Sequence, residues 1–390
     1  MDKEVIIQTS EIESTNIIYE YESVGSLEEY IKQTKTLQPY FRVDFNGLKA
    51  RQYCGIINDN EDDFYILPKI TKDKDSNRDL KIFTYMLLYA NDIKLKNEDV
   101  ANAQNHKSDN ILEAFIEIFA NNLFKELQKG IYKTYITQQE NITTLRGKYL
   151  INENLKHNFT HHKIYCEFDE FSHDNTLNQF LLYAIKSLMR FTKNKKRLKQ
   201  CELILDEVEY CIVDIKNINI HFDRLNSRFK KSFDLAMLLL NKSMPLFEKD
   251  KRSFAFLFDM NILFEKFISK LYKSIELSTK TQYQENFGDL TLKPDIYRDN
   301  LIIDVKYKIP ENKKASREDK YQMFVYGTNF EIQNTMLLYP QYKKEIKEDF
   351  KLGEGDKKMI NLKIRSIDLN FEGDYDGYIK KIRERLENLR

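Results

Sequence analysis

The sequence predicts an α+β protein of more than one domain, and three patterns along the chain support this. The N-terminal region contains β-rich runs joined by turns, whereas the middle of the chain places apolar residues at helical spacing. After residue 253, expected helices alternate with expected strands. We therefore expect a β-rich N-terminal domain over residues 1–105, a helical middle region over 106–250, and a C-terminal α/β domain with a mixed sheet over 251–390.

The N-terminal region combines helices with a hairpin. A capping-box pattern predicts a short helix over about 26–37. The β-rich runs 51–57 and 63–70 are joined by an acidic turn, which predicts a hairpin. The apolar run 80–91 has helical length, and the polar stretch 94–110 after it is the first expected boundary.

The rest of the chain is expected to be helical first and mixed later. Apolar residues recur at helix spacing from Ile111 to Leu123, and Asp174 is a candidate N-cap for a helix over 174–192. The further elements expected from the pattern are helices over 194–208, 228–242 and 254–272, strands over 291–297, 301–308, 335–340 and 363–370, a lysine-rich loop over 309–318, a helix over 318–329 and a final charged helix over 378–390.

Composition indicates an ordered protein of a reducing compartment. The chain has 390 residues, of which 42% are hydrophobic, enough for two or three cores. Its four cysteines are scattered, and it shows neither an apolar signal segment nor a run long enough to span a membrane. We therefore expect a cytoplasmic location and no membrane partner. The net charge of +1 gives no global reason for binding nucleic acid, so any such contact must be local.

The run 292–308 carries the clearest chemical signal. A Pro-Asp pair at Asp295 precedes a short apolar strand that contains Asp304 and leads into Lys306. Because strand side chains alternate, Asp304 and Lys306 are expected on one face, about 7 Å apart, opposite the apolar side chains. Two carboxylates can hold a hard divalent cation, and a lysine can orient a water or stabilise charge on phosphorus. This pattern is typical of metal-dependent phosphodiester cleavage.

The same charged pair also has an ordinary structural explanation. Charged residues make up 32% of the chain, so Asp-x-Lys triplets arise by chance and most form solvated faces or ion pairs. Here, however, the pair interrupts a strand that is otherwise apolar and expected to be buried on at least one face. Burial of a carboxylate and an ammonium is costly unless they are paired or bind a metal. The pattern therefore favours a functional site, with a structural ion pair as the alternative.

Two helices that flank this hairpin contribute further candidates. Glu265 lies between apolar neighbours and could be an additional metal ligand or hold the water. Equally, it could be an exposed glutamate paired with Lys266 or Lys270. Gln322 and Tyr326 are four residues apart on the following helix and therefore share a face. They could support the lysine of the motif or touch a phosphate backbone, although Tyr326 could equally belong to the core.

Other polar clusters are less specific. His157, His161, His162 and Cys166 resemble zinc ligands, but no second pair follows at finger spacing, so a surface patch on a strand is the better interpretation. The sequence has no P-loop motif, so nucleotide binding through a P-loop is not expected. The basic loop after the motif could contact phosphate, although a solvated loop explains any single one of its cations slightly better; these are Lys308, Lys313, Lys314, Arg317 and Lys320.

Sequence blocks with a specific order and spacing run along most of the chain. They are 53–70 with its Leu-Pro-Lys, 129–150 with its Leu-Arg-Gly, 166–184, 222–236, and the segments LFEKF, PDI…IIDVKYK, YQMFVYG and LLYP around the motif. Together these blocks resemble the McrC family, the endonuclease subunits of McrBC-type and LlaJI-like modification-dependent restriction systems, which carry a C-terminal PD-(D/E)xK nuclease. Several loops do not align with the family.

The resemblance implies a function and a set of site residues. Asp295, Asp304 and Lys306 would form the nuclease centre with Glu265 and Gln322 as accessories, and Asp295, Asp304 and Glu265 would bind Mg²⁺. The activity would be a Mg²⁺-dependent endodeoxyribonuclease acting on double-stranded DNA in phage defence. The N-terminal and helical portions would dock onto an AAA+ GTPase hexamer, which binds the GTP and recognises the modified base. Self-association through the nuclease domain is a further expectation.

Two other functions remain open at this point. A stand-alone PD-(D/E)xK restriction or repair nuclease would cleave DNA by itself, without GTP. A mainly non-catalytic GTPase activator would have a distorted or metal-free site, which the intact Asp295, Asp304 and Lys306 argue against. Cleavage of DNA with and without the GTPase partner distinguishes these functions.

Overall fold

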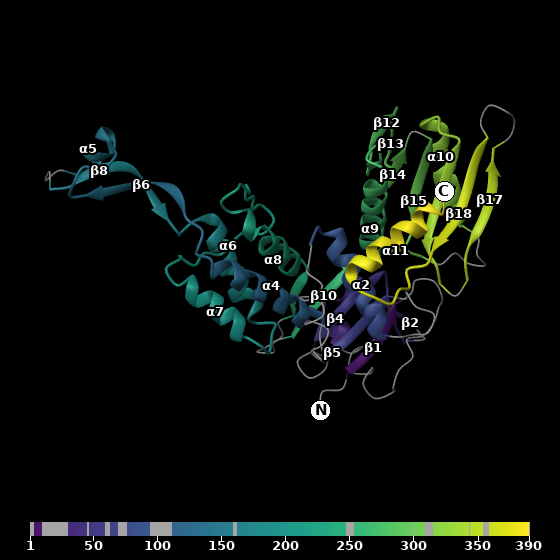
Figure 1. Cartoon of the computed structure of the whole chain (residues 1–390), viewed down its shortest axis with the longest axis horizontal. Coiled ribbons are helices and arrows are strands. Elements are labelled where there is room, and N and C mark those ends of the chain that lie inside the picture. The colour runs from purple at the N-terminus through teal and green to yellow at the C-terminus, as the bar shows by residue number, and fades with distance from the viewer. Residues whose placement is uncertain are drawn as a thin grey trace. The chain divides into compact units, whose positions relative to one another are not determined.

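The computed structural model describes most of the chain (Figure 1). Its residues group into two compact units, Met1–Leu112 with Lys242–Arg390, and Glu113–Asn241. No described helix has the length and apolar character needed to cross a bilayer. The described residues are 4–9, 30–44, 47–58, 63–68, 76–93, 111–158, 162–246, 253–298, 300–308, 315–342, 344–353 and 359–389.

A five-stranded sheet joins the N-terminal and C-terminal segments of the first unit. Its strand order is β1-β5-β4-β10-β9. The expected hairpin is confirmed, since β4 pairs antiparallel with β5, and β10 pairs antiparallel with the other edge of β4. Helix α2 (Ser76–Ala90), also expected, lies against β5. The strands of this sheet are β1 (Glu4–Thr9), β4 (Tyr53–Asn58), β5 (Asp63–Pro68), β9 (Ser243–Leu246) and β10 (Ser253–Asp259), while β2 (Phe41–Asp44) and β3 (Gly47–Ala50) form a separate two-stranded sheet.

Strand β10 corrects the expectation of one long helix over 254–272. The five residues Phe254–Phe258 are all buried, as in a strand covered on both faces, and they pair with β4. The side chain of Asp259 then accepts hydrogen bonds from the backbone N–H groups two and three residues further on, which caps helix α9 (Met260–Ile275). A short apolar run does not distinguish a buried strand from a buried helix, and this ambiguity explains the error.

The two units differ from the three consecutive parts expected over 1–105, 106–250 and 251–390. Because β10 pairs with β4, the first and last parts belong to one unit. The middle part corresponds to the second unit, which contains a three-stranded sheet of order β6-β8-β7 beside its helices. The polar stretch 94–110 lies outside the described residues, as does the beginning of the helix expected over 26–37.

The second unit confirms the helices expected there and corrects one cap. Asn175, and not Asp174, caps α6, since its side chain accepts from the N–H of Asn178 at 3.1 Å. The Asp174 carboxylate accepts instead from the N–H of Glu209 at 3.0 Å. The elements are α4 (Ile111–Leu127), β6 (Thr134–Ile142), β7 (Lys148–Tyr149), α5 (Ile151–His157), β8 (Ile164–Ser172), α6 (Thr176–Leu188), α7 (Lys196–Ile204) and α8 (Lys230–Lys242).

A six-stranded mixed sheet forms the C-terminal part of the first unit (Figure 1). Its order is β11-β14-β15-β16-β18-β17, with β15, β16 and β18 parallel and β14 and β17 antiparallel to their neighbours. Helix α10 (Arg317–Asn329) packs against this sheet, while α9 contacts β15. The strands are β11 (Lys280–Thr281), β14 (Ile296–Arg298), β15 (Leu301–Val305), β16 (Asn334–Pro340), β17 (Lys347–Leu352) and β18 (Ile360–Ile367), beside a separate hairpin of β12 (Glu285–Phe287) and β13 (Leu290–Leu292).

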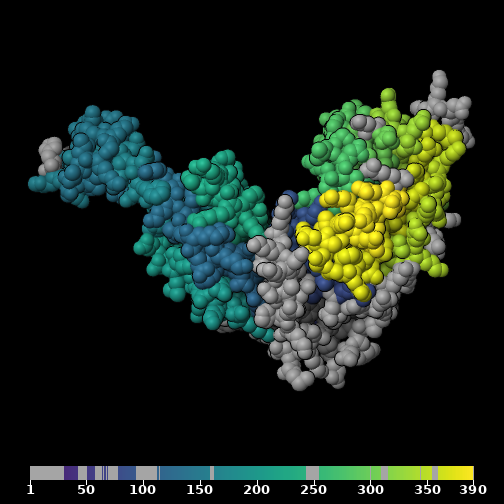
Figure 2. Space-filling view, in the orientation of Figure 1, coloured from purple at the N-terminus to yellow at the C-terminus, as the bar shows by residue number. Residues whose placement is uncertain are grey.

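The sheet differs from expectation mainly at its edge. Strand β17 was not expected, because its charged sequence lacks an apolar run; it is an edge strand whose side chains alternate between exposed and half-buried. The final helix α11 (Tyr375–Glu387) is confirmed and lies at the surface, drawn in yellow in Figure 2. Its Tyr378 stacks on Phe267 of α9, so α11 packs against the helix that precedes the β14–β15 hairpin.

Candidate active site

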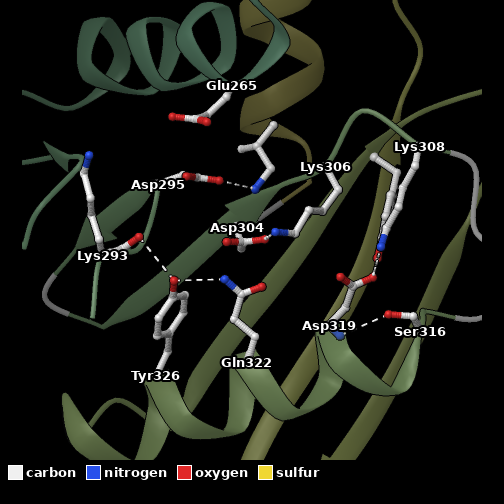
Figure 3. Close-up of polar contacts among 12 residues, drawn as sticks. Glu265, Lys293, Asp295, Asp304, Lys306, Lys308, Ser316, Asp319, Gln322 and Tyr326 are labelled. Carbon is white, nitrogen blue, oxygen red and sulfur yellow. Dashed lines mark hydrogen bonds and ion pairs between the residues drawn. The ribbon is translucent and has the colours of Figure 1, made fainter. Parts of the chain in front are cut away.

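The β14–β15 hairpin places the two predicted aspartates side by side. Asp295 immediately precedes β14, and its carboxylate accepts a hydrogen bond from the backbone N–H of Val305 at 2.8 Å. Asp304 lies within β15, and its Oδ2 is 2.8 Å from the Nζ of Lys306 (Figure 3). The grouping of Asp295, Asp304 and Lys306 expected from their spacing is therefore present.

Strand β15 is more deeply buried than alternation alone predicted. The sequence suggested one apolar face opposite a charged face, but residues 302–305 are all buried, so the strand is covered on both faces. Asp304 is only 2% exposed. The strand ends at Val305, and the N–H of Lys306 donates to the carbonyl of Leu338 at 2.9 Å, which fixes the lysine at the end of β15.

Glu265 joins the aspartates from helix α9. The amide of Gln282 donates to both Glu265 and Asp295, the latter at 3.2 Å, and so links the two carboxylates. The alternative, a pair between Glu265 and a lysine of α9, is wrong, because Lys266 donates to Asn91 and Lys270 contacts Asp92. Glu265 is half-buried among acids and is not an exposed glutamate.

Gln282 was missed by the sequence interpretation. It has a left-handed backbone with φ of 53°, rare for a residue other than glycine, and its N–H donates to the carbonyl of Asp295 at 3.0 Å. Such backbone positions are enriched at functional sites. Its sequence neighbours form no motif, so its place follows from the turn geometry and not from a readable pattern.

Burial raises the pKa values of all three acids, and the charges of neighbouring carboxylates add to this for Asp295 and Glu265. Burial raises the pKa of Asp295 to about 7, and the charges of Asp304 and Glu265 add to this effect. Burial also raises the pKa of Asp304, against the opposing influence of Lys306. For Glu265, burial and the charge of Asp304 raise the pKa in the same way. A positive charge placed among these carboxylates would relieve this cost.

The environment of Lys306 favours its charged form. Burial by itself lowers the pKa of its ammonium, but the attraction of Asp304 outweighs this and the pKa lies above its ordinary value. Lys306 is therefore a permanent cation at the edge of the acidic group. It can stabilise negative charge or hold a water there.

Helix α10 presents Gln322 and Tyr326 on one face, as expected. The Gln322 amide donates to the Tyr326 hydroxyl at 3.0 Å, and this hydroxyl donates to the carbonyl of Lys293 at 3.2 Å. Figure 3 shows Gln322 extending toward Asp304. Tyr326 also packs in the core of the sheet, so it both fills the core and supports the turn before Asp295.

Two of the expected phosphate-binding cations have partners within the protein. Lys308 contacts the Asp319 carboxylate at 2.6 Å, and Lys320 lies over the ring of Phe350 at 4.3 Å. Arg317 is exposed. Residues 309–314, which include the two remaining lysines, lie outside the described residues. Asp319 was not singled out from the sequence because it resembles an ordinary first-turn acid of α10.

The histidine cluster has ordinary surroundings where it is described. The ring of His157 stacks on Tyr165, and Cys166 is fully buried in β8. His161 lies outside the described residues. Within the described part of the chain, no three His, Cys, Asp or Glu side chains form a ready-made set of metal ligands. The paired oxygens of Asp295 and Asp304 could nevertheless hold a hard divalent cation, which needs only one or two carboxylates besides water and substrate oxygens.

Sequence comparison identifies the family. Residues 48–340 match the model of the family described as McrBC 5-methylcytosine restriction system component. This chain belongs to the McrBC family. A comparison with curated proteins finds no match.

Two solved structures share the fold of this McrBC family member. One chain comes from the half-complex of a Thermococcus gammatolerans tetradecameric assembly of McrB AAA+ hexamers with bound McrC; it is 22% identical, aligns over 100% of both chains and has a TM-score of 0.68. A chain of the T. gammatolerans McrBC complex is 24% identical, covers 69% of this chain and 87% of its own, and has a TM-score of 0.51. The α+β fold class expected from the sequence is thus confirmed.

Proposed function

We propose that this McrBC family member is the DNA endonuclease subunit of a GTP-dependent, modification-dependent restriction complex. It cleaves phosphodiester bonds of double-stranded DNA with Mg²⁺, and it binds and stimulates an AAA+ GTPase that holds the GTP. The observation that carries the proposal is the convergence of Asp295, Asp304 and Lys306 at the end of β15.

The chemistry of these side chains fits a Mg²⁺ site. Mg²⁺ is commonly held by one or two carboxylates together with waters and substrate phosphates, which is what Asp295 and Asp304 can provide, with Glu265 nearby. The raised pKa values of the three acids support this, because a buried carboxylate group of this kind gains most from a divalent cation. When bound, Mg²⁺ polarises the phosphate and lowers the pKa of an attacking water.

The remaining residues of the site have distinct tasks in this proposal. Lys306, held at 2.8 Å from Asp304, stabilises negative charge on the phosphate as the bond to the water forms. Gln322 extends into the site from α10 and is positioned by its hydrogen bond to Tyr326. Gln282 keeps Glu265 close to Asp295. The residues thus bind, orient and stabilise, while the attacking group is a water.

Dependence on a GTPase partner is supported by the family and by the surface of the chain. One matched structure contains McrB AAA+ hexamers with bound McrC, the other is an McrBC complex, and this sequence lacks a P-loop of its own. Large exposed apolar patches mark interaction surfaces. In the second unit, the β6-β8-β7 sheet and α5 carry exposed apolar side chains, and two of them, Tyr135 and Phe171, are in ring contact; the others are Tyr149, Ile151 and Leu155.

The test is DNA cleavage with Mg²⁺, with and without the cognate GTPase and GTP. We expect the wild type to cut only in the complete mixture and Asp304→Ala to cut under no condition while still stimulating GTP hydrolysis. Asp289→Ala, an exposed acid in the turn of the β12–β13 hairpin, is the matched control and should cut as the wild type does. Undiminished cutting by Asp304→Ala would show that Asp304 is not part of the nuclease centre. Cutting by the isolated chain without GTP would identify a stand-alone nuclease.

A further inference from the structure

The two lysines that follow β15 have side chains on the same side of the chain. Lys306 and Lys308 have side chains that are 28% and 35% exposed, whereas Tyr307 between them is only 8% exposed and packs against the ring of Phe264. This alternation is that of an extended segment, in which residues two apart point the same way. Both ammonium groups therefore lie near the buried acids (Figure 3).

Each lysine forms an ion pair with a different carboxylate. Lys306 contacts Asp304 at 2.8 Å, and Lys308 contacts Asp319 at 2.6 Å. Asp319 is 5% exposed and also accepts a hydrogen bond from the hydroxyl of Tyr339 at 3.1 Å. Its backbone N–H is capped by Ser316 at 3.1 Å. The position of Asp319 is thus set by α10 and by β16 together, independently of Lys308.

The pairing matters because Lys308 is within electrostatic reach of Asp304. Lys308 lies only two residues from Lys306, whose ammonium contacts Asp304 at 2.8 Å, and its own ammonium is held 2.6 Å from Asp319. A lysine has a flexible stem and a compact charge, so without a fixed partner its ammonium can move to the nearest carboxylate. A second ammonium on Asp304 would compete directly with a divalent cation for the same oxygens.

We propose that Asp319 is a positioning residue that holds the Lys308 ammonium away from Asp304, so that the Asp304 carboxylate stays open to a divalent cation. This inference rests on the proposed nuclease function, because it concerns the same cation site. Asp319 itself touches neither the cation nor the substrate. Its effect on cation binding is transmitted through Lys308 alone, and this gives the proposal a specific signature.

The test is calorimetric binding of Mn²⁺ to the full-length chain, without DNA. Asp304→Ala serves as the blank, which removes the contribution of unrelated surface sites. We expect Asp319→Asn to weaken Mn²⁺ binding about tenfold, which corresponds to ~1.4 kcal/mol. The double variant Asp319→Asn/Lys308→Met should return to within about twofold of the wild type, and Lys308→Met alone should change the affinity by less than about threefold.

Other outcomes separate this inference from its rivals. If Lys308→Met weakens binding as much as Asp319→Asn, and the double variant is not rescued, the pair is merely structural and the inference is overturned. Should Asp319→Asn fail to fold, the comparison of the double variant with Lys308→Met decides, since both should bind Mn²⁺ alike. If the wild type binds no more Mn²⁺ than Asp304→Ala, the proposed cation site fails. Normal wild-type binding with an unaffected Asp319→Asn variant overturns only the role of Asp319.

Discussion

A cluster of three carboxylates and a single separate carboxylate lie in the same α/β core and have opposite electrostatic character. In the first, Asp295, Asp304 and Glu265 approach one another, and burial raises the pKa of each. The separate carboxylate, Asp319, is buried as well, yet Lys308 and Tyr339 overcome the effect of burial and its pKa lies below the ordinary value. Burial therefore does not by itself set the direction of the pKa shift, which also depends on the charges that surround each acid.

The difference indicates what each group is for. Asp319 has its countercharge within the protein, so the pair is complete by itself. The three acids have an ion pair with Lys306, hydrogen bonds from the amide of Gln282 and the more distant charge of Lys293, which leaves fewer cations than carboxylates. Structures retain such an arrangement where an external cation or a reaction uses it. Removal of one acid at a time tests this difference.

The largest contrast is expected in DNA cleavage. Asp304→Asn should reduce the cleavage rate by at least about 1000-fold, because a metal ligand supplies several kcal/mol of transition-state stabilisation. Asp319→Asn, measured at saturating Mg²⁺, should reduce it by less than about tenfold, since Asp319 acts only through Lys308. The measurement is the single-turnover rate with the GTPase partner and GTP. Equal losses in the two variants would show that the two groups of acids are not functionally distinct.

For the free energy of unfolding we expect the opposite order, with the larger effect at Asp319 and the smaller one in the three-acid cluster. Asp319→Asn should lower the free energy of unfolding by about 2 kcal/mol, less than for a fully enclosed pair because Lys308 is partly exposed. Asp295→Asn should leave it unchanged or raise it by up to about 1 kcal/mol at pH 8, since the charged form is disfavoured in the fold. Denaturation with a chelator present measures both.

The pH dependence provides the control for this second prediction. An acid whose pKa is raised on folding binds more protons in the folded state, so its contribution to stability is lost as pH rises through its folded pKa, about 7 for Asp295. At pH 5 the difference between Asp295→Asn and the wild type should therefore disappear. If Asp295→Asn is more stable than the wild type by the same amount at pH 5 as at pH 8, the charge of Asp295 is not the cause of the difference.

Sequence reasoning succeeded where local spacing determines geometry. The i, i+2 spacing of Asp304 and Lys306 in an apolar run, and the turn that returns Asp295 to the neighbouring strand, are short-range features that alternation predicts. Helical spacing likewise predicted the shared face of Gln322 and Tyr326. The acid–lysine motif and its immediate helix neighbours could therefore be found without a structure.

The errors and omissions involve contacts between residues distant in sequence. Strand β10 forms because β4, about two hundred residues earlier, provides a partner, and no local pattern in Phe254–Phe258 reveals that pairing. Gln282 and Asp319 reach their partners through a left-handed turn and through the packing of α10. Their neighbours in sequence are unremarkable polar residues. Tertiary placement, and not residue type, makes them part of the site.

A third, smaller effect should appear in the protons exchanged when a cation binds. At pH 6 the Asp295 carboxyl, with a pKa of about 7, is mostly protonated, and a cation can bind its oxygens only after that proton leaves. We expect release of about one proton per Mn²⁺ at pH 6, falling toward none at pH 8.5. Calorimetry in two buffers of different ionisation enthalpy measures the number. Asp319→Asn should release the same number, because Asp319 is already ionised; a release lost with Asp319 would assign the proton to the wrong group of acids.

The smallest effect is expected for Gln282, although it contacts two of the three acids. Its amide lowers the pKa of Glu265, but this is the weakest of the influences on that carboxyl, and burial with the charge of Asp304 dominates. Gln282→Ala should therefore change Mn²⁺ affinity by less than about threefold, in line with the modest value of an exposed hydrogen bond to a charged group. Titration calorimetry checks this, with Gln284→Ala, an exposed glutamine two residues away, as the matched control. A loss tenfold or larger would mean that Gln282 is needed to hold Glu265 and Asp295 in position for the cation.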